Sequence, residues 1–365
     1  MPKEKTTSSK IIFKKKVIFN KKSLNANIFQ NNTKTLKPIK PKTSHKIKKI
    51  DFDPFGIYPN DLELGKPILL VDLGYTTFYR FNATKTWYKN AHPEELDEIK
   101  QTDYQWADNS IFMEMFNKRY VNSILEISQK YKIPKHNVIL AQDCSSCDNW
   151  RGKLYKDYKL TRKQNQIKYG FDGKEVFKSA HSYTFNAMAE NYGFKLIKHK
   201  DIEADDVNAI ITQYYQKHYP KVNVYILATD KDYLQLSNGY FHLIDFKGKI
   251  LNVNSNDLKL GDGKYQLWYK ILIGDKSDNI PAIKIQRKYV RPHLKSNDDT
   301  YIYINKKDGA EIATNIKQFL KNIKQDPNII NQEQLNLNKT LIDFDCIPTK
   351  YQKYIVNVLE KNIYI

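Results

Sequence analysis

The sequence predicts an α/β fold built on a parallel sheet, and three short apolar runs carry this prediction. The runs cover residues 66–72, 137–143 and 222–228, and segments long enough for helices separate them. Short continuous apolar runs are typical of strands that are buried on both faces, as in parallel sheets. Strands that alternate with helical segments are the pattern of an α/β sheet.

Each apolar run leads into an acid. Asp72 and Asp143 end the first two runs, and Asp230 and Asp232 follow the third. In open α/β sheets, ligands bind outside the carboxyl ends of the strands. Since parallel strands end at the same edge, we expect these carboxylates to lie close together.

Three further carboxylates, Glu203, Asp205 and Asp206, occupy four consecutive positions before an apolar run. Acids complement the positive end of the helix dipole, so this pattern predicts the first turn of a helix. An ordinary acidic helix start with a solvated face is the plain alternative. Carboxylates this close repel one another unless a cation lies among them, and Mg²⁺ prefers such oxygen ligands.

The second half of the chain is predicted to be mainly helical. An amphipathic segment at 265–273 leads into Asp275 and Asp278, which are three residues apart and can share one side of a turn. We also expect helices at 109–131, 310–323, 332–340 and 350–359, and a short hairpin at 301–304.

Together these patterns predict one cleft with nine carboxylates, which would be incomplete without divalent ions. The candidate metal ligands are Asp72, Asp143, Glu203, Asp205, Asp206, Asp230, Asp232, Asp275 and Asp278. Two metals about 4 Å apart would suit a phosphoryl displacement. No histidine lies at a metal-ligand spacing or within these motifs, which argues against a zinc hydrolase.

A stretch dense in cations and aromatics follows the second apolar run, at residues 149–163. Arg and Lys there can hold phosphates, and Tyr or Trp can stack on unpaired bases. The alternative is a solvated basic helix with a few core aromatics. The candidate nucleic-acid contacts in this stretch are Arg151, Lys153, Tyr155, Tyr158 and Lys163.

The net charge of +20 over 365 residues, with a pI of about 9.4, suggests a polyanionic partner, first nucleic acid and second an anionic membrane. Residues 1–50 hold fifteen Lys and one acid, so they supply +14 of this charge. We expect a disordered basic arm there, which either tethers nucleic acid or only aids solubility. No apolar run is long enough to span a membrane, no secretory signal is evident, and the three cysteines fit a reducing compartment. A cytoplasmic location is therefore expected.

These motifs, in this order and spacing, resemble the flap-endonuclease-type 5′ nucleases from residue 66 to about 290. The matching residues are Leu70-Val71-Asp72, Asp143 followed by Trp150-Arg151, Asp157-Tyr158-Lys159 with Arg162, Glu203-Ala204-Asp205-Asp206, Thr229-Asp230-Lys231-Asp232, and Gly274-Asp275-Lys276-Ser277-Asp278-Asn279. A narrower resemblance, supported by the residues around Asp275 and by Leu341–Pro348, is to the ribonuclease H group of T-even bacteriophages.

The resemblance implies a nuclease core of the PIN type at 51–273, a mobile helical arch at about 150–190, and a helical DNA-binding region of the helix-two-turn-helix type at 274–365. It implies 5′→3′ hydrolysis of RNA primers and 5′ flaps with two Mg²⁺ ions, or Mn²⁺ as a substitute. Asp72, Asp143, Asp205 and Asp230 would hold the first ion with Glu203 beside it. Asp232, Asp275 and Asp278 would hold the second, with Asp206 supporting.

The same resemblance gives Lys159 and Arg162 a catalytic role facing the scissile phosphate. The usual glycine-repeat hairpin is absent after Asp278, so Lys284, Arg287 and Lys288 are expected to contact phosphate by side chain. DNA and RNA–DNA duplexes are the implied substrates of a monomer that binds no membrane. A sliding clamp and a single-strand-binding protein are partners of phage relatives, whose proteins act in the infected bacterial cell.

Two other functions fit part of these observations. One is a non-catalytic binder of branched nucleic acid that keeps the fold, although such a binder has no need of nine carboxylates. The other is a related metal nuclease that acts on RNA in another pathway.

Overall fold

The computed structural model describes residues 56–57, 62–100, 104–144, 149–251, 263–283 and 331–361. All of them belong to one compact unit, Phe52–Ile365. The expected basic arm at 1–50, the hairpin at 301–304 and the helix at 310–323 lie outside the described residues. In the described part of the chain, no helix combines the length and apolarity needed to cross a bilayer.

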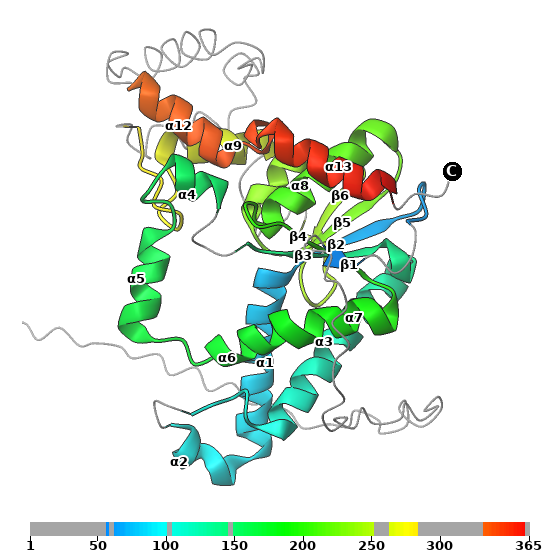
Figure 1. Ribbon diagram of the computed structural model, residues 1–365, viewed down its shortest axis with the longest axis vertical. Coiled ribbons are helices and arrows are strands. Elements are labelled where there is room, and N and C mark those ends of the chain that lie inside the picture. Colours follow the sequence, from blue (N-terminus) through cyan, green and yellow to red (C-terminus); the bar gives the residue numbers. More distant parts are fainter. Residues whose placement is uncertain are drawn as a thin grey trace, which may run out of the picture. The chain divides into compact units, whose positions relative to one another are not determined.

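A six-stranded sheet forms the centre of this unit (Figure 1). Its strands follow the order β1-β4-β3-β2-β5-β6 and comprise β1 (Gly56–Ile57), β2 (Ile68–Asp72), β3 (Val138–Gln142), β4 (Lys195–Lys198), β5 (Val224–Leu227) and β6 (Phe241–Ile244). All neighbouring pairs are parallel except β1 with β4. The predicted α/β fold with a parallel sheet is confirmed, and the three predicted strands are β2, β3 and β5.

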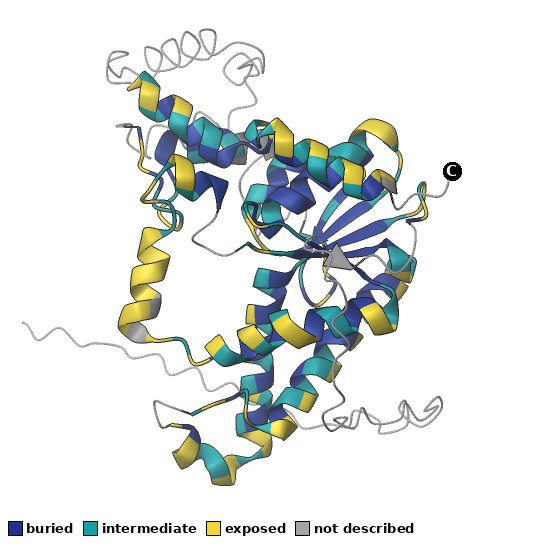
Figure 2. Ribbon diagram, viewed as in Figure 1, coloured by how far each residue is buried: buried dark blue, intermediate teal, exposed yellow. Residues whose placement is uncertain are grey.

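The two faces of the sheet bury different cores because successive side chains of a strand point to opposite faces. In β2, Ile68 and Leu70 enter one core, whereas Leu69 and Val71 enter the other. All four of these residues are fully buried. Figure 2 shows strands β2 to β6 mainly in the colour of buried residues, so this part of the sheet is covered on both sides.

Helices α1 (Leu73–Ala91), α3 (Ser110–Lys130) and α7 (Phe185–Tyr192) cover one face of the sheet with a largely aromatic core. Helix α8 (Ala204–His218) covers the other face, and α13 (Thr349–Lys361) packs against it. The short elements between them are η1 (Pro93–Glu95), α2 (Leu96–Ile99), η2 (Lys135–Asn137), η4 (Lys231–Leu236) and η8 (Phe344–Cys346). The predicted helices at 109–131 and after Glu203 correspond to α3 and α8.

The C-terminal helices share a core with the sheet. The predicted helices in this part are α9 (Gly263–Ile273), α12 (Gln332–Ile342) and α13. Phe344, Tyr351 and Ile355 are buried in the same cluster as residues of β2 and α8. The boundary expected at 273–274 therefore lies inside one compact unit.

The segment expected to form the arch contains α4 (Trp150–Leu154), α5 (Leu160–Tyr169), α6 (Lys174–Ser179), a π-helical turn (Ala180–Thr184) and α7. Its two ends belong to the core, since Trp150, Val176 and Phe185 are buried. Helix α5 is exposed along its described side chains and stands apart from the sheet in Figures 1 and 2. The part that projects from the core is thus shorter than 150–190.

Candidate metal and nucleic-acid site

The order of the strands explains why acids that are distant in sequence meet. Strands β4, β3, β2 and β5 are consecutive neighbours in the sheet, and an acidic segment follows each of them. Asp72 ends β2, and Asp143 comes directly after β3. Glu203 caps α8 after β4, and Asp230 caps η4 after β5. The predicted edge of the sheet therefore carries all four acidic segments.

Gly74 allows Asp72 and Asp143 to approach one another. A Cβ atom at position 74 would lie 2.6 Å from Asp143 Oδ2 and 3.4 Å from Asp72 Oδ1. The first distance is shorter than any normal contact, so a side chain at this position would displace the Asp143 carboxylate. The sequence analysis missed Gly74, although its place two residues after Asp72 was a usable signal.

Hydrogen bonds fix the orientation of Asp72. Its Oδ1 accepts from the backbone N–H of Tyr75 at 3.0 Å, as the cap of α1. Its Oδ2 accepts from the buried hydroxyl of Tyr233 at 3.0 Å, and Asn208 Nδ2 donates to that hydroxyl at 3.0 Å. Tyr233 and Asn208 therefore position a predicted metal ligand, and the sequence analysis found neither.

The N-terminus of α8 binds carboxylates through its free backbone N–H groups. Ala204 N donates to Asp143 Oδ1 at 2.9 Å, and Asp206 N donates to Asp205 Oδ1 at 2.7 Å. Because these N–H groups have no partner within the helix, acids are favoured at this point. The helix start that the sequence predicted thus helps to collect the acids.

Arg151 is buried and binds protein carboxylates rather than facing solvent. Its side chain is 2% exposed, and its guanidinium lies 2.8 Å from Asp206 Oδ1 and 3.4 Å from Glu203 Oε2. Its Nε donates to the Leu341 carbonyl at 2.8 Å, which ties α4 to α12. The burial of Arg151 and its carboxylate partners disfavour the predicted contact with nucleic acid and indicate a structural role.

Asp206 is likewise not placed to bind a metal. It is fully buried, and its Oδ2 accepts from Trp150 Nε1 and Arg151 Nη1, both at 3.0 Å, and from Glu203 N at 3.2 Å. Protein donors therefore surround this carboxylate. The expected supporting role at the second metal is corrected to a structural one, which fixes the start of α8.

Lys159 and Tyr158 lie at the base of α5 and contact Glu203. Lys159 Nζ is 2.5 Å from Glu203 Oε1, and the Tyr158 hydroxyl donates to Glu203 Oε2 at 2.9 Å. The same hydroxyl lies 3.3 Å from Asp278 Oδ2. The Tyr158 hydroxyl therefore joins the two groups of acids, and contact of its ring with nucleic acid stays a prediction.

Asp275 and Asp278 lie on a turn that Gly274 makes possible. Asp275 and Ile280 exchange backbone hydrogen bonds of 2.9 and 2.8 Å, and Gly274 has a φ of +72°. A Cβ at Gly274 would lie 2.3 Å from the Ile280 carbonyl oxygen, so glycine is required both for the backbone conformation and for space. Asp275 and Asp278 therefore lie on one turn, as the sequence predicted.

Two cations hold this second group of acids. Lys270 Nζ on α9 lies 2.7 Å from Asp275 Oδ2 and also contacts Asp232 Oδ1. Arg162 Nη2 lies 2.6 Å from Asp278 Oδ1, and its Nε donates to the Ser277 carbonyl at 3.0 Å. A small pocket opens between the two groups, lined by Asp205, Asp232, Asp275, Asp278, Arg151 and Tyr158 among others. Lys270 was not among the predicted site residues.

The electrostatics of the site follow from burial and from the partner of each acid. Burial raises the pKa of Asp72 to about 7, and the charge of Asp143 adds to the shift. Burial and the charge of Asp230 likewise raise the pKa of Asp232 to about 7. Burial opposes the ionisation of Glu203, but Lys159 and Arg151 outweigh it and lower the pKa of Glu203 to about 2.

Asp205 has a raised pKa and Asp275 a lowered pKa, which is the same contrast as between Asp72 and Glu203. Burial, together with the charges of Asp206 and Glu203, raises the pKa of Asp205 despite the opposing effect of Arg151. Lys270 and the donors of Ser277 outweigh the burial of Asp275 and lower its pKa to about 2. The negative charge of this site is therefore reduced in two ways. Acids with raised pKa values are more readily protonated, and acids with lowered pKa values are paired with protein cations.

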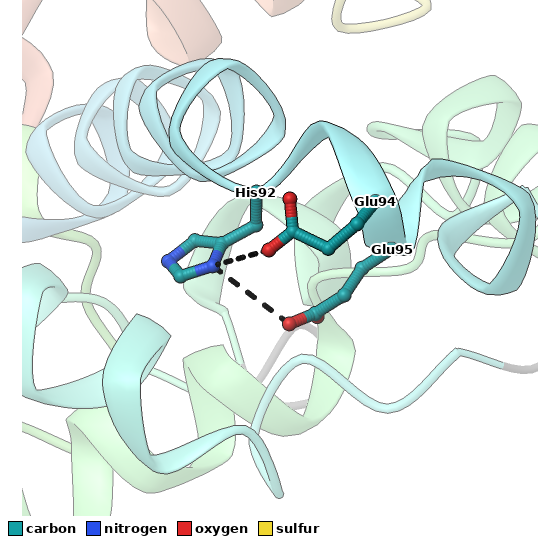
Figure 3. Close-up of side chains that lie close together, drawn as sticks. All are labelled: His92, Glu94 and Glu95. Atoms are coloured by element: carbon teal, nitrogen blue, oxygen red, sulfur yellow. Dashed lines mark hydrogen bonds and ion pairs between the residues drawn. The ribbon is translucent and has the colours of Figure 1, made fainter.

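The donor set of the site fits hard divalent ions, since every candidate ligand is a carboxylate. Among the described residues, no three candidate ligand atoms of this site lie within 4.8 Å of one another. Within the described ranges, the one such set is His92, Glu94 and Glu95 (Figure 3). In this set His92 Nδ1 lies 3.3 Å from Glu94 and 3.8 Å from Glu95.

The histidine cluster is separate from the predicted site and had no counterpart in the sequence analysis, which found no histidine at a metal-ligand spacing. Asp72 caps the start of α1 and His92 caps its end. A helix of 19 residues is about 28 Å long at 1.5 Å per residue. The two sets of ligands therefore cannot share an ion.

The other predicted nucleic-acid contacts lie around α5 and differ in their exposure and in their partners. Lys163 is exposed, whereas Lys153 pairs with Asp201 at 2.7 Å and Tyr155 donates to the Asn279 carbonyl at 3.2 Å. Lys284, Arg287 and Lys288 lie outside the described residues. The helix nevertheless presents a basic surface beside the acidic site.

A carboxylate-rich site at the edge of a parallel sheet, beside an exposed basic helix, is typical of metal-dependent nucleases. Residues 114–260 match the family model of the 5′-3′ exonuclease N-terminal resolvase-like domain. The chain is 22% identical to ribonuclease H of Enterobacteria phage T4 over 67% of this chain and 78% of the relative. It is 32% identical to flap endonuclease Xni of Shewanella denitrificans over 41% of this chain and 55% of that protein.

A solved structure shares the fold. The flap endonuclease of bacteriophage T5, in a pseudo-enzyme-product complex with DNA and metal ions, matches with a TM-score of 0.54 and 16% identity over 81% of this chain and all of that chain. The family model and the two relatives support the flap-endonuclease-like superfamily of 5′ nucleases, whose matched members are enzymes that hydrolyse nucleic acids. The resemblance inferred from the motifs is thereby confirmed.

Replacing Arg151 by Met should lower the free energy of unfolding by about 3–5 kcal/mol, because it leaves the fully buried Asp206 carboxylate without its cation. Urea unfolding of the whole chain measures this loss. Arg162→Met is the matched control, since the Arg162 side chain is 51% exposed. Equal effects of the two substitutions would contradict a structural role for Arg151.

Replacing Gly74 by Ala should weaken divalent-ion binding by about 10–100-fold, as is usual when the orientation of metal ligands is disturbed. Thermal stability should change little, because the displaced group is the end of a side chain. Calorimetric titration with Mn²⁺ measures the affinity. Gly239→Ala is the control, since a Cβ at Gly239 meets no atom within 4 Å. Unchanged Mn²⁺ affinity would show that the close approach of Asp72 and Asp143 is not needed.

Replacing Asp72 by Asn should stabilise the metal-free protein above neutral pH. The pKa of Asp72 is about 7 in the folded protein against a reference value of 3.8. The folded state therefore keeps a proton that the unfolded chain loses, and the wild-type free energy of unfolding falls as pH rises through this window. The amide side chain of the Asp72→Asn variant does not titrate, so it causes no such fall in the free energy of unfolding.

Thermal unfolding in EDTA at about pH 5 and about pH 8 tests this difference. The gain in stability of Asp72→Asn should be larger at the higher pH. Asp108→Asn, at an exposed position, controls for the change of net charge. The same gain at both pH values would argue against a raised pKa at Asp72.

Proposed function

We propose that the protein is a Mg²⁺-dependent 5′→3′ nuclease that removes RNA primers and 5′ flaps during DNA replication. The observation that carries this proposal is a cluster of uncompensated acids beside a basic helix. Within the described residues, no Lys, Arg or His nitrogen lies within 4.0 Å of Asp72, Asp143 or Asp230. Negative charge of this kind repels a nucleic acid unless divalent ions bridge the two.

The same observation disfavours the non-catalytic alternative. A binder of branched nucleic acid gains affinity from cations that neutralise phosphates. Uncompensated carboxylates at the base of α5 would weaken such binding and serve no purpose in it. Their presence beside Lys159 and Arg162 therefore supports hydrolysis.

In this proposal the acids form two metal-binding groups. The first group contains Asp72, Asp143, Asp205 and Asp230, with Glu203 beside it, and the second contains Asp232, Asp275 and Asp278. When bound, Mg²⁺ or a substituting Mn²⁺ would activate the attacking water and stabilise the leaving oxygen. The remaining tasks, which are to bind and orient the phosphate, fall to side chains of this protein.

Lys159 and Arg162 are the residues proposed to bind the scissile phosphate. Both lie at the start of α5 and now contact Glu203 and Asp278, respectively. Charge-assisted bonds from Arg and Lys to phosphate are strong, and Arg can make them in pairs. Once ions satisfy the acids, these two cations are available to a phosphate oxygen. Lys153, Tyr155 and Lys163 are the proposed contacts further from the reaction.

Substrates and partners are proposed from the relatives. The T5 enzyme forms a complex with DNA and metal ions, and the named relatives are a ribonuclease H and a flap endonuclease. We therefore propose DNA and RNA–DNA duplexes with 5′ ends or flaps as substrates, cut by a monomer in the cytoplasm. The proposed protein partners are a sliding clamp and a single-strand-binding protein, and residues 274–365 are proposed to bind the duplex.

The test uses a 5′-labelled RNA-primed DNA duplex and a matched 5′-flap substrate, each with Mg²⁺ or with EDTA. Metal-dependent release of short 5′ products is the expected result. Asp230→Asn should remove cleavage and leave substrate binding largely intact, because it deletes a metal ligand and adds no repulsion. A gel-based cleavage assay and fluorescence anisotropy measure the two properties.

Asp108→Asn is the control, since it makes the same change of charge at an exposed position at the start of α3. Full cleavage by Asp230→Asn would refute the assignment of the site. Tight binding without cleavage under any divalent ion would favour the non-catalytic binder. Cleavage of RNA without any requirement for a 5′ end would favour a nuclease of another pathway.

A further inference from the structure

The two groups of acids differ in how the protein itself neutralises them. Asp72, Asp143 and Asp230 have no cation within 4.0 Å among the described residues. In the second group, Lys270 contacts Asp232 and Asp275, and Arg162 contacts Asp278. Arg151 lies 3.9 Å from Asp205, the fourth acid of the first group. Three acids of the first group therefore depend on an added cation, whereas every acid of the second group contacts a protein cation.

Lys270 contacts the Asp275 oxygen that Ser277 does not bind. Asp275 Oδ1 accepts from Ser277 N at 2.8 Å and from Ser277 Oγ at 2.6 Å. Asp275 Oδ2 is the partner of Lys270 Nζ at 2.7 Å. A divalent ion that approaches Asp275 Oδ2 from the cleft therefore meets the positive charge of this ammonium group, and the two cations repel each other.

The backbone of Lys270 is part of α9, and its side chain reaches the acids through a flexible stem. The Lys270 carbonyl accepts from Gly274 N at 2.7 Å at the end of α9. The side chain is 21% exposed and has four methylene groups, so its ammonium can leave the acids without a movement of the helix. The ammonium can then pair with another anion close by.

We propose that Lys270 is a resident cation of the second group of acids, which must be displaced before a second divalent ion can bind. This inference rests on the proposed two-ion function of the site. Without nucleic acid, the protein binds one divalent ion, at the group around Asp72. A substrate phosphate then favours binding of the second ion in two ways. It is a ligand for the ion, and it is a partner for the displaced ammonium.

Metal binding and substrate binding are therefore coupled at this group. If substrate raises the affinity for the second ion, the second ion raises the affinity for substrate by the same factor. Such coupling would keep the second group free of metal until a 5′ end is in place. Lys270 acts here as a positioning residue for the ion and not as a group that touches the reacting bond.

The first test counts Mn²⁺ ions bound to the full chain without nucleic acid, by electron paramagnetic resonance. We expect one tight ion in the wild type. In Lys270→Met the second ion should bind at least roughly tenfold more tightly, because a repelling charge has left the site. Lys178→Met is the matched control, since Lys178 pairs with Glu175 on the exposed side of α6, and it should behave as the wild type.

The second test follows Lys270 itself in the wild type and does not depend on the folding of a variant. The ¹⁵N resonance of its ammonium group, assigned by its loss in Lys270→Arg, should shift only when a second equivalent of Mg²⁺ is forced to bind. A shift with the first equivalent would overturn the proposal.

The outcomes separate this inference from the proposed function. If the wild type binds two ions of equal affinity, or if Lys270→Met gains nothing, the resident-cation proposal fails while a two-ion nuclease remains. If the wild type binds no divalent ion at all, both proposals fail.

Discussion

Repulsion between carboxylates is the constraint on which the rest of this structure depends. Eight acids of the predicted set remain in the candidate site after Asp206 is assigned to the scaffold, and four of them line its pocket: Asp205, Asp232, Asp275 and Asp278. Other groups offset the charge of most of these acids. Arg151 and Lys159 act on Glu203, while Lys270 and Arg162 act on the acids of the second group. The N–H groups at the start of α8 hold Asp143 and Asp205. Raised pKa values at Asp72 and Asp232 show where this compensation is incomplete.

The scaffold provides this compensation through a few long-range contacts. Arg151 joins α4, α8 and the carbonyl of Leu341, which is 190 residues away in sequence. Tyr158 joins Glu203 to Asp278, and Asn279 exchanges hydrogen bonds with Thr161 at the base of α5. The position of α5 is therefore linked directly to the turn that carries Asp275 and Asp278. A disturbance of the acids should change the base of this helix as well.

The sequence was sufficient for the carboxyl ends of the central strands and for helices α3, α8, α9, α12 and α13, whereas the long helix α1 was not predicted. Buried parallel strands need continuous apolar runs, and acids at their ends converge by topology alone, as β2, β3 and β5 show. Strand β4 was missed because it has only four residues and Lys195 and Lys198 at its ends. Local composition does not show where such a short segment will pack in the fold.

Side-chain roles were harder to predict than positions, because burial and partner choice are decided by the whole fold. Arg151 lies in a basic stretch that looks solvent-exposed in sequence, yet Asp206 and Leu341 enclose it. Tyr233 and Lys270 belong to no sequence pattern that marks them as part of an acidic site. Their contribution is visible only when η4 and α9 are placed beside β2.

The backbone at Lys159 has one more consequence. Its φ of +56° places a non-glycine residue in the left-handed region at the start of α5. Side chains with a branched Cβ are poorly tolerated there, whereas Asn and Gly adopt this conformation readily. Evolution at this position is therefore limited by backbone shape as well as by charge. Substitution of Lys159 by Gly would remove the whole side chain and keep the turn, whereas alanine would retain a Cβ atom in this left-handed conformation.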